Sequence, residues 1–381
     1  MPAPRVIVAS DKFKGTLTSA EVAAAVDAGV RRVRPDATVV AIPVADGGDG
    51  TLAAAVAAGF QLVPVTASGP TGEPVHTAYA RRRASADRGA PRGFGRSGGR
   101  DDVAVVELAD VSGLVRLPAG RPAPMTATSY GTGQLIAAAI DAGCRKVILG
   151  IGGSASTDGG AGLVHALTGT ESLDLPALRQ RLRGVEIVVA CDVDNPLTGP
   201  KGAAAVYGPQ KGATPEQIAD LDSALSRWAD LVARETGRDL RDAPGAGAAG
   251  GVGFAALALL DADLRPGIEL VLDLVGFHEQ LVGADLVITG EGALDEQTLH
   301  GKAVAGIAAA AARVPGSVGA PGTPVVAVCG VNRLDHEQLR AAGVVAAYAL
   351  TDLEPDVRRC IAEPVPLLER VGEWIAREHL R

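Results

Sequence analysis

Five short loops in this chain combine glycine with aspartate, glutamate, lysine, serine or threonine, the residue types that bind charged oxygens. Glycine lets the backbone approach a ligand closely, carboxylates bind divalent cations, and lysine neutralises phosphoryl oxygens. Phosphoryl transfer needs this mixture of cations, metal-binding carboxylates and a positioned base. The loops are SDKFKGT (10–16), ADGGDGT (45–51), GGSASTDGGAG (152–162), CDVDNP (191–196) and GEGALDEQT (290–298).

The third of these loops has the strongest features of a phosphate-binding loop. It follows the apolar run KVILGI (146–151) and precedes LVHAL (163–167), so that strand, glycine-rich loop and helix come in the required order. Backbone N–H groups and the N-terminus of the helix would then face an anion. In the alternative interpretation the loop is structural, and Asp158 caps the helix that follows.

Carboxylates in the other loops suit Mg²⁺, which prefers a few oxygen ligands together with substrate phosphates. A single Asp-Gly-Gly loop is more often a tight turn with a helix cap than a binding site. Five loops that combine glycine with charged and hydroxyl residues, at what should be one edge of the fold, together favour a functional site.

The elements that position these loops alternate between strand and helix. Short β-branched runs, each followed by a polar loop and usually by a helix, predict parallel sheet, in which ligands bind beyond the carboxyl ends of the strands. The first helix should begin near Thr18, which forms a capping box with Glu21. The predicted strands are 6–10, 38–44, 146–151, 186–190, 285–290, 324–330 and 344–350.

Residues 60–125 differ, because apolar and polar residues alternate there as in a half-buried antiparallel or mixed sheet. The pattern predicts two α/β domains. Residues 1–66 and 285–381 would form an outer, parallel-sheet domain of the flavodoxin or Rossmann type, interrupted by an inserted mixed-sheet domain, 67–284.

Composition excludes several classes of protein. Of 381 residues, 47% are hydrophobic and 21% are charged, which is ordinary for a globular chain. No apolar run approaches the ~18–20 residues of a membrane span, no signal peptide is recognisable, and the four cysteines lack C-x-x-C spacing. We therefore expect a cytoplasmic protein without a disulfide framework or a zinc site.

The net charge of −8 argues against nucleic acid as the main partner. The segment 81–100 is an exception, with seven arginines and one aspartate. A solvated insertion in a surface loop is the favoured interpretation, and a tether for an anion or a nucleic acid is the alternative. Lysine is rare, with six among 36 basic residues, and occurs mainly in glycine-rich loops, which marks those loops for attention.

Familiar nucleotide motifs are missing or out of context. The chain has no G-x-x-x-x-G-K-[ST] loop and no protein-kinase motif set. GAGAAG (245–250) matches the dinucleotide pattern G-x-G-x-x-G, but DLRDAP before it is no strand. An NAD-dependent oxidoreductase is thus a weaker alternative, and a helix that packs closely on the sheet is the favoured interpretation of this stretch.

Several of these segments, taken in order, resemble the bacterial glycerate kinase family over nearly the whole chain. They are SDKFKGTLTSAEVA, VADGGDGT, TSYGTGQLI, GIGGSASTDGGAG, DVDNPLTGPKGAAAVYGPQKGAT, GAGAAGGVG and DLVITGEGALDEQTLHGKA. The resemblance implies ATP-dependent, Mg²⁺-supported phosphorylation of D-glycerate to 2-phosphoglycerate. It also implies two α/β domains, one inserted in the other, with the site in the cleft between them.

The resemblance also suggests roles for the loop residues. Asp192 or Asp46 would be the base, with Lys12 as a further catalytic group. Asp49, Glu291 and Asp295 would bind Mg²⁺. Substrate would contact Lys14, Asp11 and Asn195, and the nucleotide would contact Gly152, Gly153, Ser154, Ser156, Thr157 and Lys302.

The chain departs from the family pattern in places, for example at the arginine-rich insertion and at Ala293, where arginine is common. A third alternative is a kinase-like fold that binds a nucleotide or an acidic metabolite and regulates without catalysis. Retention of acidic or lysine residues in the loops argues against such a dead site.

Overall fold

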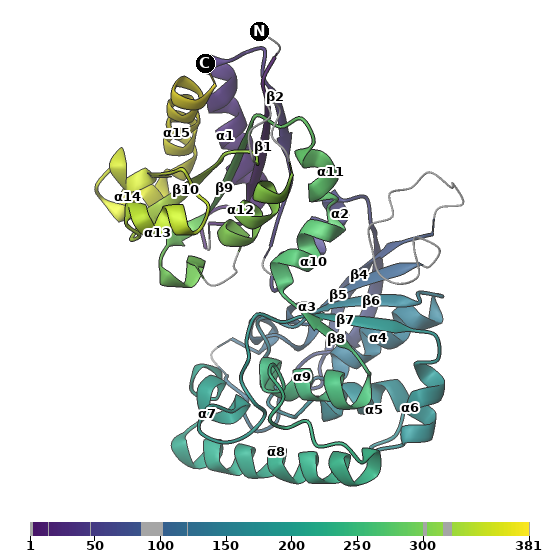
Figure 1. Cartoon of the computed structure of the whole chain (residues 1–381). Helices are drawn as coiled ribbons and strands as arrows, with labels where there is room; N and C mark the ends of the chain where they lie inside the picture. The colour runs from purple at the N-terminus through teal and green to yellow at the C-terminus, as the bar shows by residue number, and fades with distance from the viewer. Residues whose placement is uncertain are drawn as a thin grey trace. The chain divides into compact units, whose positions relative to one another are not determined.

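The computed structural model describes residues 3–13, 15–45, 47–84, 102–119, 121–299, 303–314 and 322–380. The chain divides into two compact units. Figure 1 colours the chain by residue number, from purple at the N-terminus to yellow at the C-terminus. The first unit comprises Met1–Asp46 and Ile268–Arg381, and the second comprises Gly47–Gly267.

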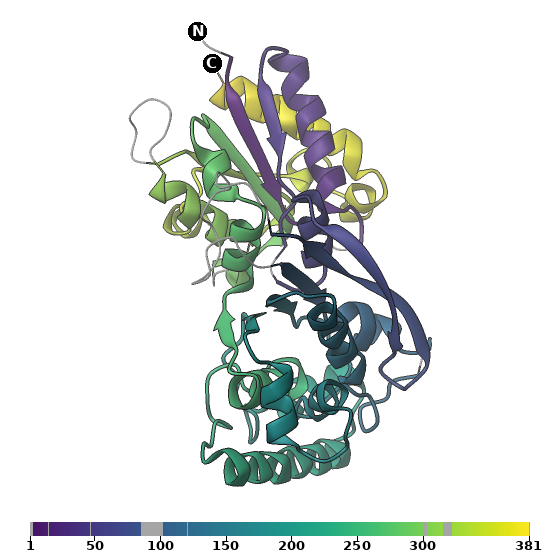
Figure 2. The same ribbon diagram turned by 90° about the vertical axis from the view of Figure 1, so that its right-hand side faces the viewer.

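The first unit is built on a parallel sheet in the order β11-β10-β9-β1-β2. Helices α1 and α15 pack on one face of this sheet and α12 packs on the other (Figure 2). The strands are β1 (Arg5–Ser10), β2 (Thr38–Ala41), β9 (Leu286–Leu294), β10 (Val325–Asn332) and β11 (Ala346–Ala349). The helices are α1 (Ser19–Val33), α10 (Gly267–Leu274), α11 (Phe277–Leu281), α12 (Ala303–Arg313), α13 (His336–Ala341), α14 (Val357–Ala362) and α15 (Pro364–His379).

The second unit is built on a mixed sheet in the order β3-β4-β5-β6-β7-β8. β3, β4 and β5 pair antiparallel, whereas β5 to β8 pair parallel. The strands are β3 (Gln61–Ser68), β4 (Pro74–Arg82), β5 (Val103–Glu107), β6 (Lys146–Gly150), β7 (Glu186–Ala190) and β8 (Asp263–Arg265). The helices are α2 (Thr51–Ala57), α3 (Ala109–Ser112), α4 (Tyr130–Asp141), α5 (Ala161–Thr168), α6 (Leu175–Arg181), α7 (Ala203–Tyr207), α8 (Pro215–Thr236) and α9 (Ala248–Leu259).

Alternate residues of the parallel strands make the core of the second unit. Val106, Leu149 and Val189 are fully buried and pack with apolar side chains of α4, α5 and α9. Removing this apolar surface from water is the main force that holds the strands in register. Their carboxyl ends therefore meet at one edge of the sheet, where the predicted loops begin.

The predicted α/β class, with one parallel and one mixed sheet, is confirmed. The helix start predicted at Thr18 is also confirmed, because Thr18 Oγ1 accepts a 3.3 Å bond from Glu21 N while Glu21 Oε2 accepts a 2.8 Å bond from Thr18 N. Strand β8 was missed, since three residues carry too little alternation to be recognised.

The compact units divide the chain at other positions than the domain boundaries that the sequence predicts at 66 and 285. Residues 47–66 belong to the second unit because α2 packs on β5 and β3 pairs with β4. Residues 268–284 belong to the first unit because α11 packs on α12. Local alternation shows that a strand exists, but not which sheet it joins.

Among the described residues, no helix has both the length and the apolar character required to cross a bilayer. The arginine-rich insertion joins β4 to β5, and residues 85–101 lie outside the described part of the chain. At its base, Arg81 forms an ion pair with Asp102, and the guanidinium of Arg82 lies 4.5 Å from the centre of the Phe60 ring.

Candidate functional site

Three of the five predicted loops lie at the carboxyl edge of the second unit's sheet, where 45–51 packs on 152–162 and where Gly267 contacts both Gly47 and Asp192. A methyl group on Gly152 would lie 2.8 Å from Gly48 Cα, and one on Gly47 would lie 2.6 Å from Gly267 Cα. Asp192, after β7, accepts a 2.8 Å hydrogen bond from Gly267 N. Backbone thus packs on backbone here, and the glycines are required because any side chain would separate the loops.

The glycine-rich loop, residues 152–158, is held from two sides. On one side Ala155 N donates to Ser112 O and Leu114 N donates to Gly153 O, both at 2.9 Å. On the other side Gly159 N, just after the loop, donates a 3.0 Å bond to Gly250 O. These contacts fix the path of the loop independently of any ligand.

The loop nevertheless keeps a set of donors without acceptors. In the part of the chain that the structure describes, no hydrogen bond is donated by the N–H groups of Gly152, Gly153, Ser154, Ser156 and Thr157. The hydroxyls of Ser156 and Thr157 have no partner among those residues either, although the two side chains lie in residues that are 0% and 5% exposed. Buried polar groups are nearly always hydrogen-bonded, so the two buried hydroxyls, together with the N–H groups of the same loop, make this loop a candidate anion-binding site.

Asp158 caps the start of the helix that follows the loop, as the alternative, structural interpretation of this residue predicted. Its Oδ1 accepts a bond from Gly160 N at 3.1 Å, and its Oδ2 accepts one from Gly162 N at 3.2 Å, at the start of α5. Oδ2 also accepts bonds from Ser129 N at 2.8 Å and Ser129 Oγ at 2.9 Å. Asp158 therefore ties the loop to the start of α4 and does not offer itself to a ligand.

Lys211 is a residue of this site that sequence reasoning did not select. It is 2% exposed, and its ammonium donates to Ser154 Oγ at 3.0 Å and to Ser156 O at 2.5 Å. Burial lowers the pKa of Lys211 to about 8, against the opposing effect of Asp158. The rarity of lysine in this sequence was the available signal, since Lys211 stands in a glycine-containing turn.

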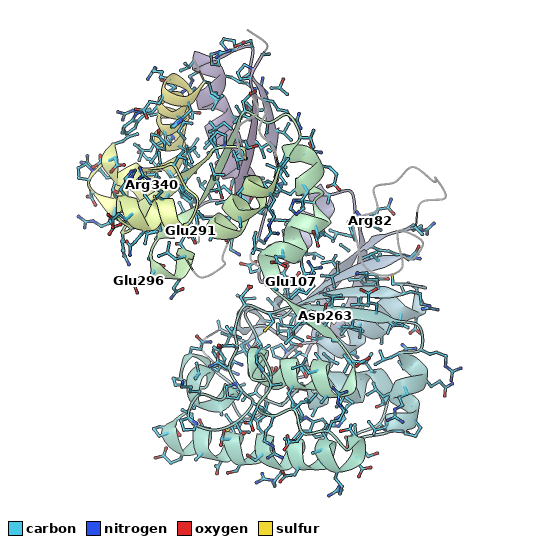
Figure 3. All side chains as sticks on the ribbon, in the orientation of Figure 1. Arg82, Glu107, Asp263, Glu291, Glu296 and Arg340 are labelled. Atoms are coloured by element: carbon cyan, nitrogen blue, oxygen red, sulfur yellow. The ribbon has the colours of Figure 1, made fainter. Side chains whose placement is uncertain are left out.

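Glu107, at the end of β5, was also missed. Its carboxylate accepts bonds from Gly50 N at 3.2 Å and Leu52 N at 3.0 Å, at the start of α2. Burial raises the pKa of Glu107 to about 7, and the carboxylates of Asp110 and Asp49 add to this rise. A glutamate inside an apolar strand carries no sequence signal for this role. Figure 3 labels Glu107 at its strand end.

Asn195 is committed to its own loop. Its Nδ2 donates to Lys201 O at 2.9 Å, and its Oδ1 accepts a 2.6 Å bond from Tyr207 OH. Asp192 is exposed, with Oδ1 held by Gly267 N as described above. The structure thus presents Asp192 to solvent while Asn195 organises the loop that carries it.

The other two loops lie side by side in the first unit, because β1 pairs with β9. Asp11 N donates to Gly290 O at 2.9 Å, and Asp11 Oδ1 accepts from Lys12 N at 2.7 Å. Glu291 Oε1 accepts a 2.5 Å bond from Thr298 Oγ1, and Asp295 Oδ1 accepts a 2.9 Å bond from Gln297 N. Figure 3 labels Glu291 at this edge.

Three predicted site residues, Lys14, Asp46 and Lys302, lie outside the described residues. The other predicted site residues lie at the carboxyl edges of two different sheets. Asp11, Lys12, Glu291 and Asp295 are in the first unit, and Asp49, Gly152, Gly153, Ser154, Ser156, Thr157, Asp192 and Asn195 are in the second.

GAGAAG has a packing role, as the favoured interpretation of that stretch expected. No strand lies between the end of α8 and Gly245, so the strand–loop–helix context of a dinucleotide site is missing. Methyl groups on Gly247 and Gly250 would lie 2.2 Å from Pro196 O and 2.0 Å from Ser156 O. These glycines let one loop touch both the Asp192 loop and the glycine-rich loop.

Known proteins with the same sequence pattern identify the family. The model of the glycerate kinase family matches residues 6–173 and 165–380. This chain belongs to the glycerate kinase family. The predicted enzyme class, a phosphotransferase with an alcohol acceptor, is confirmed by that membership.

Similar proteins cover the chain nearly end to end. A protein named glycerate kinase from Bacillus subtilis is 40% identical over 392 residues, covering 98% of this chain and 97% of that protein. One named glycerate 2-kinase from Escherichia coli is 37% identical, covering 91% and 90%. A crystal structure described as a candidate glycerate kinase 2 from Salmonella typhimurium matches with a TM-score of 0.77 and 39% identity, covering 98% of each chain.

Proposed function

We propose that this enzyme transfers the γ-phosphoryl group of ATP to the 2-hydroxyl of D-glycerate, forming 2-phosphoglycerate and ADP with the help of Mg²⁺. Family membership supports a kinase that acts on glycerate, and the name of the E. coli relative supports the 2-position. The observation that carries the nucleotide part is the row of N–H and hydroxyl donors without acceptors in the glycine-rich loop.

The glycine-rich loop is proposed to hold the phosphates of ATP. The N–H groups of Gly152, Gly153, Ser154, Ser156 and Thr157 are fixed backbone dipoles that need no reorganisation when negative charge develops on the transferring group. The hydroxyls of Ser156 and Thr157 add two further donors. Lys302 is proposed as an additional nucleotide contact.

Asp192 is the proposed general base. It stands exposed after β7, and Gly267 N fixes one of its oxygens. The carboxylate would take the proton from the substrate hydroxyl while the new oxygen–phosphorus bond forms and the bond to the ADP oxygen breaks. Asp46 is the alternative base.

The glycerate carboxylate needs a cationic or polar partner. Lys12, Lys14 and Asp11 follow β1, and we propose that the two lysines bind this carboxylate or a phosphoryl oxygen. Lysine suits this role as a compact point charge. Asn195 would orient substrate through the loop that it braces.

The carboxylates proposed for Mg²⁺ fit that ion in chemistry. Asp49 belongs to the second unit, and Glu291 and Asp295 belong to the first. Asp295 Oδ2 accepts no bond from a described residue.

No three acidic, histidine or cysteine side chains cluster as a metal cage within the described ranges. One or two carboxylates with water and phosphate oxygens are the usual Mg²⁺ shell. Bound Mg²⁺ would neutralise charge on the phosphates.

The test is ADP release from ATP with D-glycerate, with Mg²⁺ and with an excess of chelator, followed by phosphorus NMR of the product. Metal-dependent turnover and a 2-phosphoglycerate signal are expected. A 3-phosphoglycerate signal would move the reaction to the other hydroxyl. Absence of turnover by folded protein would favour a binding role. The proposal places the enzyme in the cytoplasm, where ATP is available, with small molecules as its ligands.

A further inference from the structure

Lys211 presents an incompletely paired charge inside the second unit. An ammonium has three donors, and only two of them have acceptors among the described residues, namely Ser154 Oγ and Ser156 O. Both acceptors are neutral. Because Lys211 is only 2% exposed, bulk water cannot readily accept a hydrogen bond from its third N–H group.

No carboxylate of the described residues forms an ion pair with Lys211. Asp158 is the charged group whose field reaches it, but both oxygens of Asp158 accept bonds from Ser129, Gly160 and Gly162. Removing a charge from water without a close counter-ion is costly. A positive charge retained under these conditions points to an anion as its intended partner.

The groups around Lys211 also favour a negatively charged ligand. The two acceptors of its ammonium belong to the glycine-rich loop, which also holds the unpartnered hydroxyls of Ser156 and Thr157 and five N–H groups without acceptors. By bonding Ser154 and Ser156 the ammonium also holds the curvature of that loop. Asp158 also belongs to this loop, but its oxygens accept bonds from Ser129, Gly160 and Gly162, so the side-chain groups left without partners are donors.

We propose that Lys211 is the positioning residue of the glycine-rich loop and supplies the positive charge of its anion site, and that the anion is a phosphate group of the nucleotide. This inference rests on the proposed function and adds a residue to it. Phosphate is favoured over the carboxylate of glycerate because a carboxylate has two oxygens, whereas the loop offers more donors than two oxygens can accept.

Binding of ADP without glycerate tests this directly, because it needs no turnover. The variant Lys211→Met keeps most of the side-chain volume and removes the charge. Lys201→Met is the matched control, since Lys201 is exposed and its ammonium bonds to none of the described residues. Calorimetry should show at least a tenfold weaker ADP affinity for Lys211→Met and a change under twofold for Lys201→Met.

The Michaelis constant for glycerate separates the two anions. If Lys211→Met binds ADP as wild type does while the constant for glycerate rises tenfold, the loop holds the carboxylate and the inference is wrong. Unchanged values for both ligands in a folded variant would reduce Lys211 to a packing residue. Turnover of wild-type protein is measured separately, so failure of the proposed function is distinguishable from failure of this inference.

A second measurement covers the case in which Lys211→Met does not fold. Burial lowers the pKa of Lys211 to about 8, with Asp158 as the opposing charged neighbour. Only the ammonium form attracts an anion, so the ADP dissociation constant of wild type should rise by up to about tenfold per pH unit above pH 8. A flat profile up to pH 9.5 would overturn the inference.

Discussion

The carboxyl edges of the two sheets carry different chemistry. In the second unit the edge combines N–H groups, hydroxyls and the buried Lys211 ammonium with the carboxylates of Glu107 and Asp192, whereas the first unit carries the half-buried carboxylates of Glu291 and Asp295. The edge of the first unit offers carboxylate oxygens, and that of the second offers donors beside carboxylates. Under the proposed function, the donors of the second unit bind phosphate, and Glu291 and Asp295 of the first unit are candidates for the cation.

The two edges are also held differently. In the second unit glycine contacts join the backbones of distant loops, as at Gly48 with Gly152 and at Gly250 with Ser156. In the first unit Gly290 also packs on distant backbone, since a methyl group there would lie 2.2 Å from Val328 O, but the carboxylate of Glu291 is oriented by a short local bond from Thr298 Oγ1. A site of backbone donors needs a fixed backbone, whereas carboxylate ligands can be oriented by their own side-chain partners.

The largest effect should come from Gly250→Ala. Gly250 has a φ of +68°, and a methyl group there would lie 2.0 Å from Ser156 O. We expect a loss of about 3 kcal/mol or more in the free energy of unfolding, together with weaker ADP binding. Gly237→Ala is the matched control, since its φ is +73° but nothing lies within 4 Å of the added methyl. It should cost about 1 kcal/mol. Equal losses in urea denaturation would show that the close contact is unimportant.

Asp192→Asn should come next, because the amide keeps the shape and the acceptor for Gly267 N but removes the base. We expect turnover to fall by about 10²-fold or more, with ADP affinity preserved. Steady-state kinetics at saturating ATP and glycerate measure this. Turnover near that of wild type would exclude Asp192 as the base and shift the role to Asp46.

Glu291→Gln tests the cation half of the comparison. The Mg²⁺ concentration for half-maximal activity should rise by about tenfold, since one charged oxygen ligand is lost. ADP binding without Mg²⁺ should stay as in wild type. Glu296→Gln in the same loop is the control, because Glu296 is exposed (Figure 3). A similar shift in both variants would remove the metal role from Glu291.

The smallest effect concerns Glu107 and the pH dependence of stability. The folded pKa of about 7 lies above the ordinary value of 4.5, so between these pH values the folded chain binds more protons than the unfolded chain. The contribution is complete below pH 4.5 and is lost as pH rises to about 7, with a slope of at most about 1.4 kcal/mol per pH unit. Glu107→Gln should flatten this slope in urea denaturation between pH 5 and 7. The exposed Glu171→Gln should leave it unchanged, and a slope retained in Glu107→Gln would assign it to another group.

Much of this protein could be predicted from local patterns. The strand–loop–helix order located the glycine-rich loop, and the Thr18–Glu21 capping box located the start of α1. The long shared segments identified the family. These predictions succeed because period, capping and turn chemistry act between residues that are close in the chain.

The amino-acid sequence by itself determined the two α/β sheets, the loops at the strand ends and the kinase class. Only the tertiary structure decided that Lys211 lies within hydrogen-bond distance of Ser154 and Ser156, that Glu107 caps α2, and that GAGAAG joins two loops. The physical reason is that burial, unpaired donors and close backbone contacts arise between residues far apart in the chain. No local pattern records them, because the cost of burying a charge or adding a methyl group depends on which distant atoms lie beside it.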